Sequence, residues 1–178
     1  MNCVNCKIKC DIFSRKKQDT INMLLNIEKN ISDLLFFFQY LSPNISSNLS
    51  LKINKKQSEK ILALMLSNWK EKEYKFIDNL EEDTIGILNL ENIYSKCKRI
   101  VCVKNKTESN FTCLMRHIRN SIAHGRIYII KNNTYYKLLF EDFDRNSEIS
   151  ARIIINHAIL KKWKNIIIEE IGEIYEKD

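Results

Sequence analysis

Apolar residues recur at intervals of three and four along most of the chain, a spacing that places them on one face of an α-helix. The predicted helices cover residues 11–41, 58–80, 87–101, 111–124 and a last segment from about 147 to near the C-terminus. Ser42-Pro43-Asn44 is expected to end the first helix, because a proline disfavours helical geometry at the residue before it. The polar stretches 44–55 and 105–110 are predicted loops.

The hydrophobic pattern changes after Gly125. Residues 127–130 and 135–140 are rich in β-branched and aromatic side chains, and the polar link 131–134 tolerates turn geometry, so a β-hairpin is expected here. The chain has only three glycines and one proline, which favours long helices. We therefore expect a mainly α fold of about five helices with a small β-hairpin after the fourth, in one domain over residues 1–178.

Candidate chemistry is concentrated at the end of the helix predicted over 111–124. Asn120 and His124 are four residues apart and share a helix face, and the long side chain of Arg119 can reach the same region. Gly125 is the residue type expected just past a helix end, where the backbone becomes left-handed. A histidine beside an arginine can move protons next to a phosphate, although an exposed arginine and a C-capping histidine would look the same in sequence.

This stretch resembles a known superfamily. Arg119-Asn120-x-x-x-His124 is similar to the R-x4-H motif, often R-N-x-x-x-H, of HEPN domains, and the likeness is strongest over residues 112–145. HEPN domains are helical proteins of toxin–antitoxin, abortive-infection and RNA-targeting CRISPR systems. The resemblance implies a HEPN-like helical bundle that cleaves RNA without a metal or other cofactor, in phage defence or growth arrest.

The resemblance also implies roles for single residues. Arg119 and His124 would be catalytic, Asn120 would organise the site, and two copies of the chain would meet in a homodimer with the site at the interface. Arg116 and Arg126 are candidate RNA-binding residues, with a solvated surface charge as the alternative for Arg116. His117 is expected to be structural, and His157 has no evident catalytic partner.

Charge agrees with this interpretation but does not establish it. The formal net charge is +7, which suits an acidic partner such as RNA, yet the lysines are scattered rather than clustered. The alternative to an endoribonuclease is a non-catalytic HEPN-like module that binds RNA, a nucleotide or a protein partner. An antitoxin or another defence-system protein is a further possible partner.

The cysteines and the N-terminus bear on metal content and location. Cys3-x2-Cys6-x3-Cys10 has the spacing of a partial zinc site, but three small residues on one buried helix face fit the spacing better, since no clear second pair follows. Free thiols without metal are expected. The chain has neither a signal-peptide core nor an apolar run long enough to span a membrane, so a cytoplasmic location without membrane contact is expected.

Overall fold

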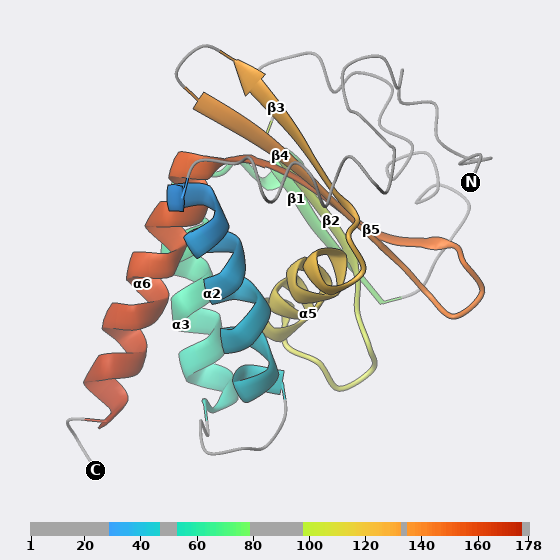
Figure 1. The fold of residues 1–178 in the computed structure, drawn as a ribbon. Coiled ribbons are helices and arrows are strands. Elements are labelled where there is room, and N and C mark those ends of the chain that lie inside the picture. Colours follow the sequence, from blue (N-terminus) through green and yellow to red (C-terminus); the bar gives the residue numbers. More distant parts are fainter. Residues whose placement is uncertain (1–28, 47–52, 79–97, 133–134, 176–178) are drawn as a thin grey trace.

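A five-stranded mixed sheet, covered on one face by helices, organises the protein (Figure 1). The computed structural model describes residues 29–46, 53–78, 98–132 and 135–175. The strands are β1 (Tyr74–Ile77), β2 (Arg99–Val103), β3 (Ile127–Asn132), β4 (Tyr135–Phe143) and β5 (Ile149–Asn156). The helices are α2 (Lys29–Ser46), α3 (Lys55–Met65), α5 (Asn110–Ala123) and α6 (His157–Tyr175), with a short 3₁₀ turn, η1 (Glu71–Glu73), before β1.

The strand order is β1-β2-β5-β4-β3. β1 runs parallel to β2, and all the other pairs are antiparallel. Four helices and this mixed sheet make an α/β fold in the described residues, so the expectation of a mainly helical bundle is wrong. Three predicted helices contain strands: β1 lies in the segment 58–80, β2 begins within 87–101, and β5 occupies the start of the last segment.

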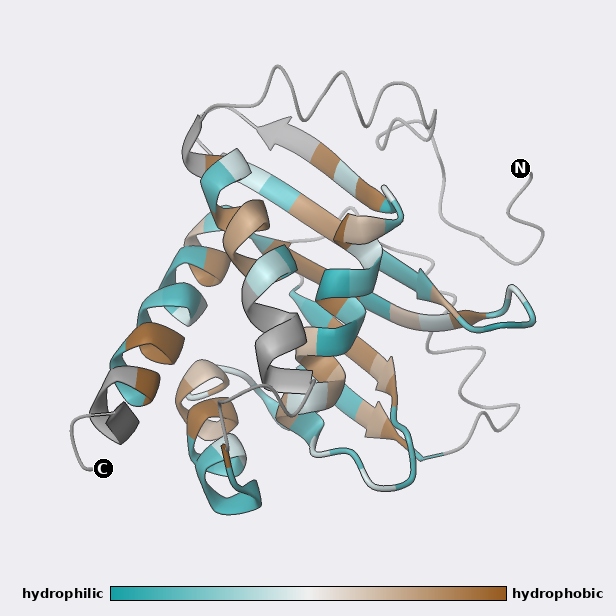
Figure 2. Ribbon diagram, turned by 60° about the horizontal axis from the view of Figure 1, so that its bottom comes forward, coloured by the Kyte–Doolittle hydropathy of each residue, from teal (hydrophilic) through white to brown (hydrophobic). Residues whose placement is uncertain are grey.

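The main hydrophobic core lies between the sheet and the four helices. Buried side chains of all four helices contribute to it, including Phe38, Met65, Leu114 and Trp163. Alternate residues in the middle of β4 and β5 point into the same core, as strand geometry requires, namely Leu138, Phe140, Ala151, Ile153 and Ile155. Figure 2 shows apolar and polar turns alternating along α6, which is the pattern of a helix with one face against a core and the other in solvent.

The opposite face of the sheet is also buried at its centre. Val101, Leu139 and Ile154 have no exposed surface there. Arg152 of β5 lies across from Glu141 of β4 in the antiparallel register, and its Nε donates to Glu141 Oε1 at 2.9 Å with both side chains buried. A buried charge needs such a partner, because desolvation without compensation costs several kcal/mol.

The hairpin prediction is confirmed, since β3 pairs with β4 from Ile127↔Phe140 to Asn132↔Tyr135. The apolar face predicted for the fourth helix is also confirmed, as is that of the first helix in its described part, where the residues from Ile31 to Phe38 that face the core are buried. Two helix ends differ from expectation. α2 continues to Ser46, past the predicted stop at Pro43. A proline lacks one backbone N–H, and near a helix end the loss of that single hydrogen bond does not end the helix. α3 ends at Met65 and is followed by η1 and β1.

Several of the sequence predictions concern parts of the chain that the structure does not describe fully. Cys3, Cys6 and Cys10 lie outside the described residues, as do residues 11–28 of the first predicted helix, part of the predicted loop 44–55 and most of the segment 87–101. Cys102 and Cys113 are free, buried thiols. Among the helices of the described residues, none combines the length and the apolar character that crossing a membrane requires.

Candidate functional site

Helix α5 carries the motif, and its sequence explains where it begins and ends. The Ser109 side chain caps the first turn by accepting a hydrogen bond from the Thr112 N–H at 3.1 Å. His124 occupies the C-cap position, and Gly125 follows with φ +63°, the left-handed conformation that glycine adopts most readily. The predicted helix over 111–124 is therefore confirmed to within one residue at each end.

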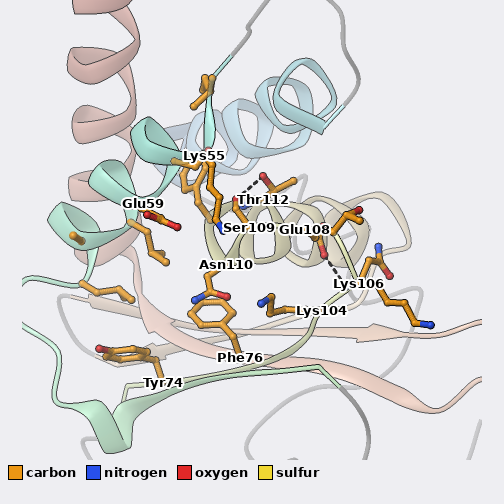
Figure 3. A pocket seen from close by; sticks show the side chains of 18 residues that line it. Lys55, Glu59, Tyr74, Phe76, Lys104, Lys106, Glu108, Ser109, Asn110 and Thr112 are labelled. Carbon is orange, nitrogen blue, oxygen red and sulfur yellow. Dashed lines mark hydrogen bonds between the residues drawn. The ribbon is translucent and has the colours of Figure 1, made fainter.

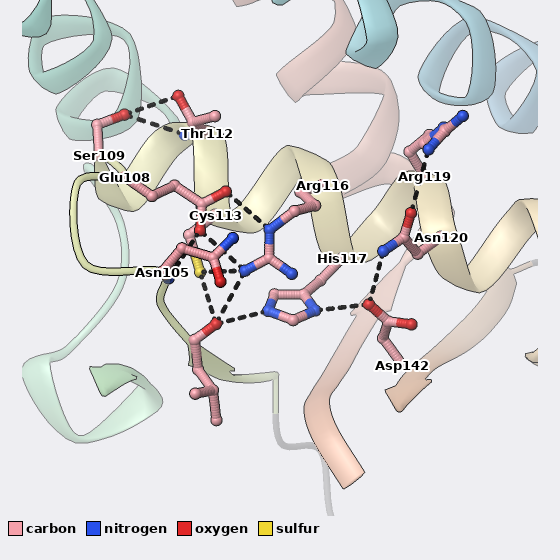
Figure 4. A network of polar contacts seen from close by, with 11 residues as sticks. Asn105, Glu108, Ser109, Thr112, Cys113, Arg116, His117, Arg119, Asn120 and Asp142 are labelled. Atoms are coloured by element: carbon pink, nitrogen blue, oxygen red, sulfur yellow. Dashed lines mark hydrogen bonds and ion pairs between the residues drawn. The ribbon is translucent and has the colours of Figure 1, made fainter. Parts of the chain in front are cut away.

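The buried side of α5 holds a polar network centred on His117 (Figure 4). The Nδ1 atom of His117 lies 2.8 Å from Asp142 Oδ2, and its Nε2 lies 2.8 Å from the Val103 carbonyl oxygen. A carbonyl oxygen only accepts, and an ionised carboxylate only accepts, so both ring nitrogens must donate. The geometry is that of a doubly protonated imidazole paired with a carboxylate.

The pKa values of this pair are shifted in the directions that the geometry requires. Burial lowers the pKa of His117, but the hydrogen bond to Asp142, together with the neighbouring Cys113 side chain, outweighs burial and raises it to about 9. Burial raises the pKa of Asp142, but the hydrogen bond and charge of His117, with a further hydrogen bond from Asn120, bring it below its usual value. His117 and Asp142 thus form a buried ion pair at neutral pH.

Asn120 connects this buried pair to the surface. Its Nδ2 donates to Asp142 Oδ2 at 3.0 Å, and its Oδ1 accepts from Arg119 Nη1 at 3.3 Å. Because Asp142 only accepts, the amide must present its oxygen towards Arg119. Asp142 therefore fixes the orientation of Asn120, and Asn120 helps to hold the guanidinium of Arg119.

Arg119 and His124 are both exposed at the C-terminal end of α5. Within the described residues, no hydrogen bond or ion pair joins Arg119 to His124 in the single chain. The last turn of the helix therefore presents a cation and an imidazole to solvent, with Asn120 between them. Such a pair can bind a phosphate group and exchange a proton with it.

Arg116 and Arg126 have partners of their own. Arg116 makes a bidentate ion pair with Glu108, with Nε–Oε1 and Nη2–Oε2 distances of 2.8 Å, and its Nη2 also donates to the Val103 carbonyl at 3.0 Å. The guanidinium of Arg126 lies over the Phe143 ring, 4.4 Å from its centroid. The first arrangement ties α5 to the loop before it, and the second ties the end of the helix to β4.

The buried thiols lie beside the network. The Cys113 thiol donates weakly to the Val103 carbonyl at 3.5 Å. A hydrogen bond from Cys102 lowers the pKa of Cys113 against the effect of burial, and His117 acts in the same direction. Among the described residues, no group of three or more His, Cys, Asp or Glu side chains is arranged to hold a metal ion.

Sequence reasoning found Arg119, Asn120 and His124 because they are neighbours on one helix. It assigned His117 a structural role but missed its partner Asp142, 25 residues further along the chain on β4. The available signal was the stretch Phe140-Glu141-Asp142-Phe143-Asp144, whose alternation places Asp142 on the face that also carries Leu138 and Phe140. That alternation identifies the face only once the strand is known to be covered by α5.

A comparison with protein families agrees with the motif. The family model described as HEPN pEK499 p136 matches residues 14–178. The chain therefore belongs to this family and carries a HEPN-type domain. No curated protein and no solved structure matches the chain.

Proposed function

We propose that the protein is a metal-independent endoribonuclease whose catalytic residues are Arg119 and His124. The observation that carries the proposal is the exposed pair at the C-terminal end of α5, with Asn120 anchored between them by Asp142. Membership of a HEPN family supports it, because R-x4-H is the motif of HEPN ribonucleases.

In this mechanism a ribose 2′-hydroxyl attacks the adjacent phosphorus and the bond to the 5′ oxygen breaks. The products are a 2′,3′-cyclic phosphate and a 5′-hydroxyl. His124 takes the proton from the attacking hydroxyl or gives one to the leaving oxygen. Arg119 stabilises the charge that builds on the phosphoryl oxygens through its two parallel N–H donors.

A single histidine cannot act as base and acid at the same moment, so we propose that the active form is a homodimer. A twofold axis near the end of α5 would bring both copies of His124 and Arg119 into one composite site. The exposed position of both side chains is compatible with this arrangement. Arg126, which follows Gly125, would lie near the same axis and contact RNA. Arg116 is a weaker candidate, because Glu108 already holds its guanidinium.

The test is RNA cleavage by purified protein in the presence of a chelator. Arg119→Ala and His124→Ala are each expected to lower the rate at least about 100-fold, in line with the loss of one transition-state donor or proton carrier. Arg145→Ala is the matched control, since Arg145 is also an exposed arginine but lies in the β4–β5 turn. Full activity in His124→Ala would exclude the catalytic assignment, and loss of activity with chelator would indicate a metal mechanism.

The same samples distinguish the alternative, a non-catalytic module that binds RNA, a nucleotide or a protein partner. A module of this kind would bind RNA without forming a cyclic phosphate end. Light scattering at micromolar concentration tests the composite site, and a strict monomer with undiminished activity would contradict it. The proposed biological role is RNA cleavage in growth arrest or phage defence, in the cytoplasm, under the control of an antitoxin or another defence protein.

A further inference from the structure

A pocket of about 1120 Å³ lies at the opposite end of α5 from the motif. It is formed by one side of α3 along its whole length, by the first turn of α5, by β1, and by the loop that joins β2 to α5 (Figure 3). Pockets for small ligands commonly enclose about 300–1,000 Å³, so this pocket is large enough for one nucleotide and part of a second. Many of its lining side chains are exposed, so the pocket is open to solvent along its rim.

One wall of the pocket is aromatic. Tyr74 and Phe76 of β1 are half-buried, and their ring centroids are 6.5 Å apart. Figure 3 shows both rings on the β1 side of the pocket, and Asn110 and Lys104 line the same pocket. Aromatic rings in an open groove are surfaces on which unpaired bases stack, and stacking tolerates any base. The amide of Asn110 can add hydrogen bonds to a base edge.

The rim of the pocket is basic. Lys55, Lys104 and Lys106 line it, and among the described residues Lys55 and Lys106 make no ion pair. In the part of the chain that the structure describes, Lys104 forms an ion pair with Asp78, whose side chain is 78% exposed, and water and salt readily weaken such a pair. Of the two acidic lining residues, Glu108 is neutralised by Arg116, and the exposed Glu59 lies on the α3 side.

We propose that this pocket binds an unpaired nucleotide of a single-stranded RNA, with the base on Tyr74 and Phe76 and the phosphate at Lys104 and Lys106. This inference rests on the proposed function in taking RNA as the ligand, and it deepens that function by naming single-stranded RNA as the substrate class. A base-paired nucleotide cannot offer its face to the rings, because its neighbours in the helix cover both faces. The combination of an aromatic wall and basic rim in an open pocket is what sequence-tolerant single-strand sites contain.

The position of the pocket gives the RNA a path. α5 has 14 residues, which at 1.5 Å per residue separates its two ends by about 20 Å. Ser109 and Asn110 of its first turn line the pocket, whereas Arg119 and His124 lie in its last turn. A single-stranded RNA bound both in the pocket and at Arg119 and His124 would run alongside α5. Binding in the pocket would then add affinity for the RNA without any contact to the scissile phosphate.

The experiment measures binding of a fluorescently labelled single-stranded RNA of mixed sequence to the full chain carrying His124→Ala, so that cleavage does not interfere. Adding Lys104→Gln and Lys106→Gln is expected to weaken binding about tenfold and to lower the slope of log affinity against log salt by about one unit. The matched control is Lys161→Gln with Lys162→Gln, two exposed lysines of α6, and its affinity should change little. Phe76→Leu keeps an apolar side chain but removes the ring, and should weaken binding about tenfold.

Circular dichroism and thermal unfolding establish that each variant is folded. Lysine variants that bind the single strand as well as the parent would overturn the proposal, and so would an equal loss for the same RNA annealed to its complement. Titration with AMP tests the other source of the same chemistry. AMP binding that depends on Lys104 and Lys106, with RNA binding unaffected, would assign the pocket to a free nucleotide instead.

The outcomes also separate this inference from the nuclease proposal. If the wild type cleaves RNA and the pocket variants have a higher KM with little change in kcat, both the nuclease proposal and the pocket proposal are supported. If the wild type cleaves nothing but RNA binding requires Lys104 and Lys106, the nuclease fails and the pocket stands. If cleavage occurs with unchanged KM in the pocket variants, the pocket fails and the nuclease stands.

Discussion

At the scale of single residues, the two histidines of α5 show how position on one helix sets chemical role. His117 has no exposed surface and two oxygen partners, whereas His124 is exposed at the C-cap. A buried imidazole held between a carboxylate and a carbonyl is fixed in one protonation state at neutral pH, so it serves packing and orientation. The exposed one lies at the surface, which is the position that the proposed proton transfer requires.

The protonation state of His117 can be measured directly. Imidazole ¹⁵N chemical shifts should show both nitrogens protonated at neutral pH, with titration near pH 9. The pKa of His117 in the folded protein lies above its ordinary value of 6.5. The protonated His117 side chain therefore stabilises the fold fully below pH 6.5 and progressively less as pH rises towards 9. In Asp142→Asn the ring should become neutral at lower pH, and an unchanged titration in that variant would contradict the ion pair.

Asn120 should act as a positioning residue rather than a reacting group. Asn120→Ala removes the hydrogen bonds to Asp142 and Arg119 and should lower kcat with little change in KM, at a cost of about 1 kcal/mol in stability. Asn120→Asp keeps the shape but places a second carboxylate about 3 Å from Asp142 Oδ2. The Asp variant should therefore be the less stable of the two at pH 7. Urea unfolding should show that the difference in the free energy of unfolding between the two variants becomes smaller as pH falls towards 4. A stability difference between the two variants that does not change with pH would argue against charge repulsion.

Among elements, those with a local signal were predictable from sequence and those without one were not. α5 has a cap, an apolar stripe and a terminal glycine within 17 residues, and β3 and β4 alternate on either side of a polar link. β5 is buried on both faces along most of its length, so its apolar residues do not alternate and they fit a helical spacing as well. Three consecutive isoleucines, Ile153 to Ile155, were the β-branched signal that favours a strand.

The C-terminal end of α5 depends on the conformation of Gly125. An added Cβ there meets no atom within 4 Å, so the cost of Gly125→Ala comes from the backbone, at φ +63°. We expect a loss of about 1 kcal/mol in the free energy of unfolding, and a smaller loss for Gly125→Asn, because asparagine tolerates this conformation better. Denaturant unfolding measures both. Equal stability of all three proteins would mean that the chain leaves the left-handed conformation at no cost.

The central strands depend on the buried pair of Glu141 and Arg152. Glu141→Ala leaves Arg152 without this partner and should cost about 3–5 kcal/mol. The double variant Glu141→Leu with Arg152→Met replaces both charges with apolar groups of similar size. It should be more stable than Glu141→Ala, and a double-mutant cycle measures the coupling. A double variant as unstable as the sum of the single changes would show that the two residues act independently.

For the whole molecule, the helical part of the fold was anticipated but its architecture was not. Strand pairing joins β1 to β2 and β2 to β5, segments far apart in the chain, and no periodicity within one segment reports such pairing. The same holds for the site: Arg119, Asn120 and His124 are close in sequence, while Asp142, which holds Asn120, comes from β4, and the carbonyl that binds His117 comes from the end of β2. The family match over residues 14–178 extends well beyond the motif.

An active nuclease should be visible in living cells. Expression of the wild type is expected to slow growth of a bacterial host, while the Arg119→Ala and His124→Ala double variant is not, since a positively charged RNase that tolerates many sequences finds substrate in any cytosol. Growth curves at matched expression levels measure the effect. Equal growth inhibition by both forms would favour the binding module. If neither form inhibits growth, phage challenge should show protection by the wild type alone.

The carbonyl oxygen of Val103 accepts hydrogen bonds from three side chains of α5, those of Cys113, Arg116 and His117. The shared acceptor is a peptide atom, which every amino acid supplies. Exchange of Val103 for isoleucine or threonine would leave all three contacts available, whereas changes at 116 or 117 would remove one each. In a library of variants, we therefore expect the fold to accept many residues at position 103 and few at position 117, although both positions take part in the same hydrogen bond.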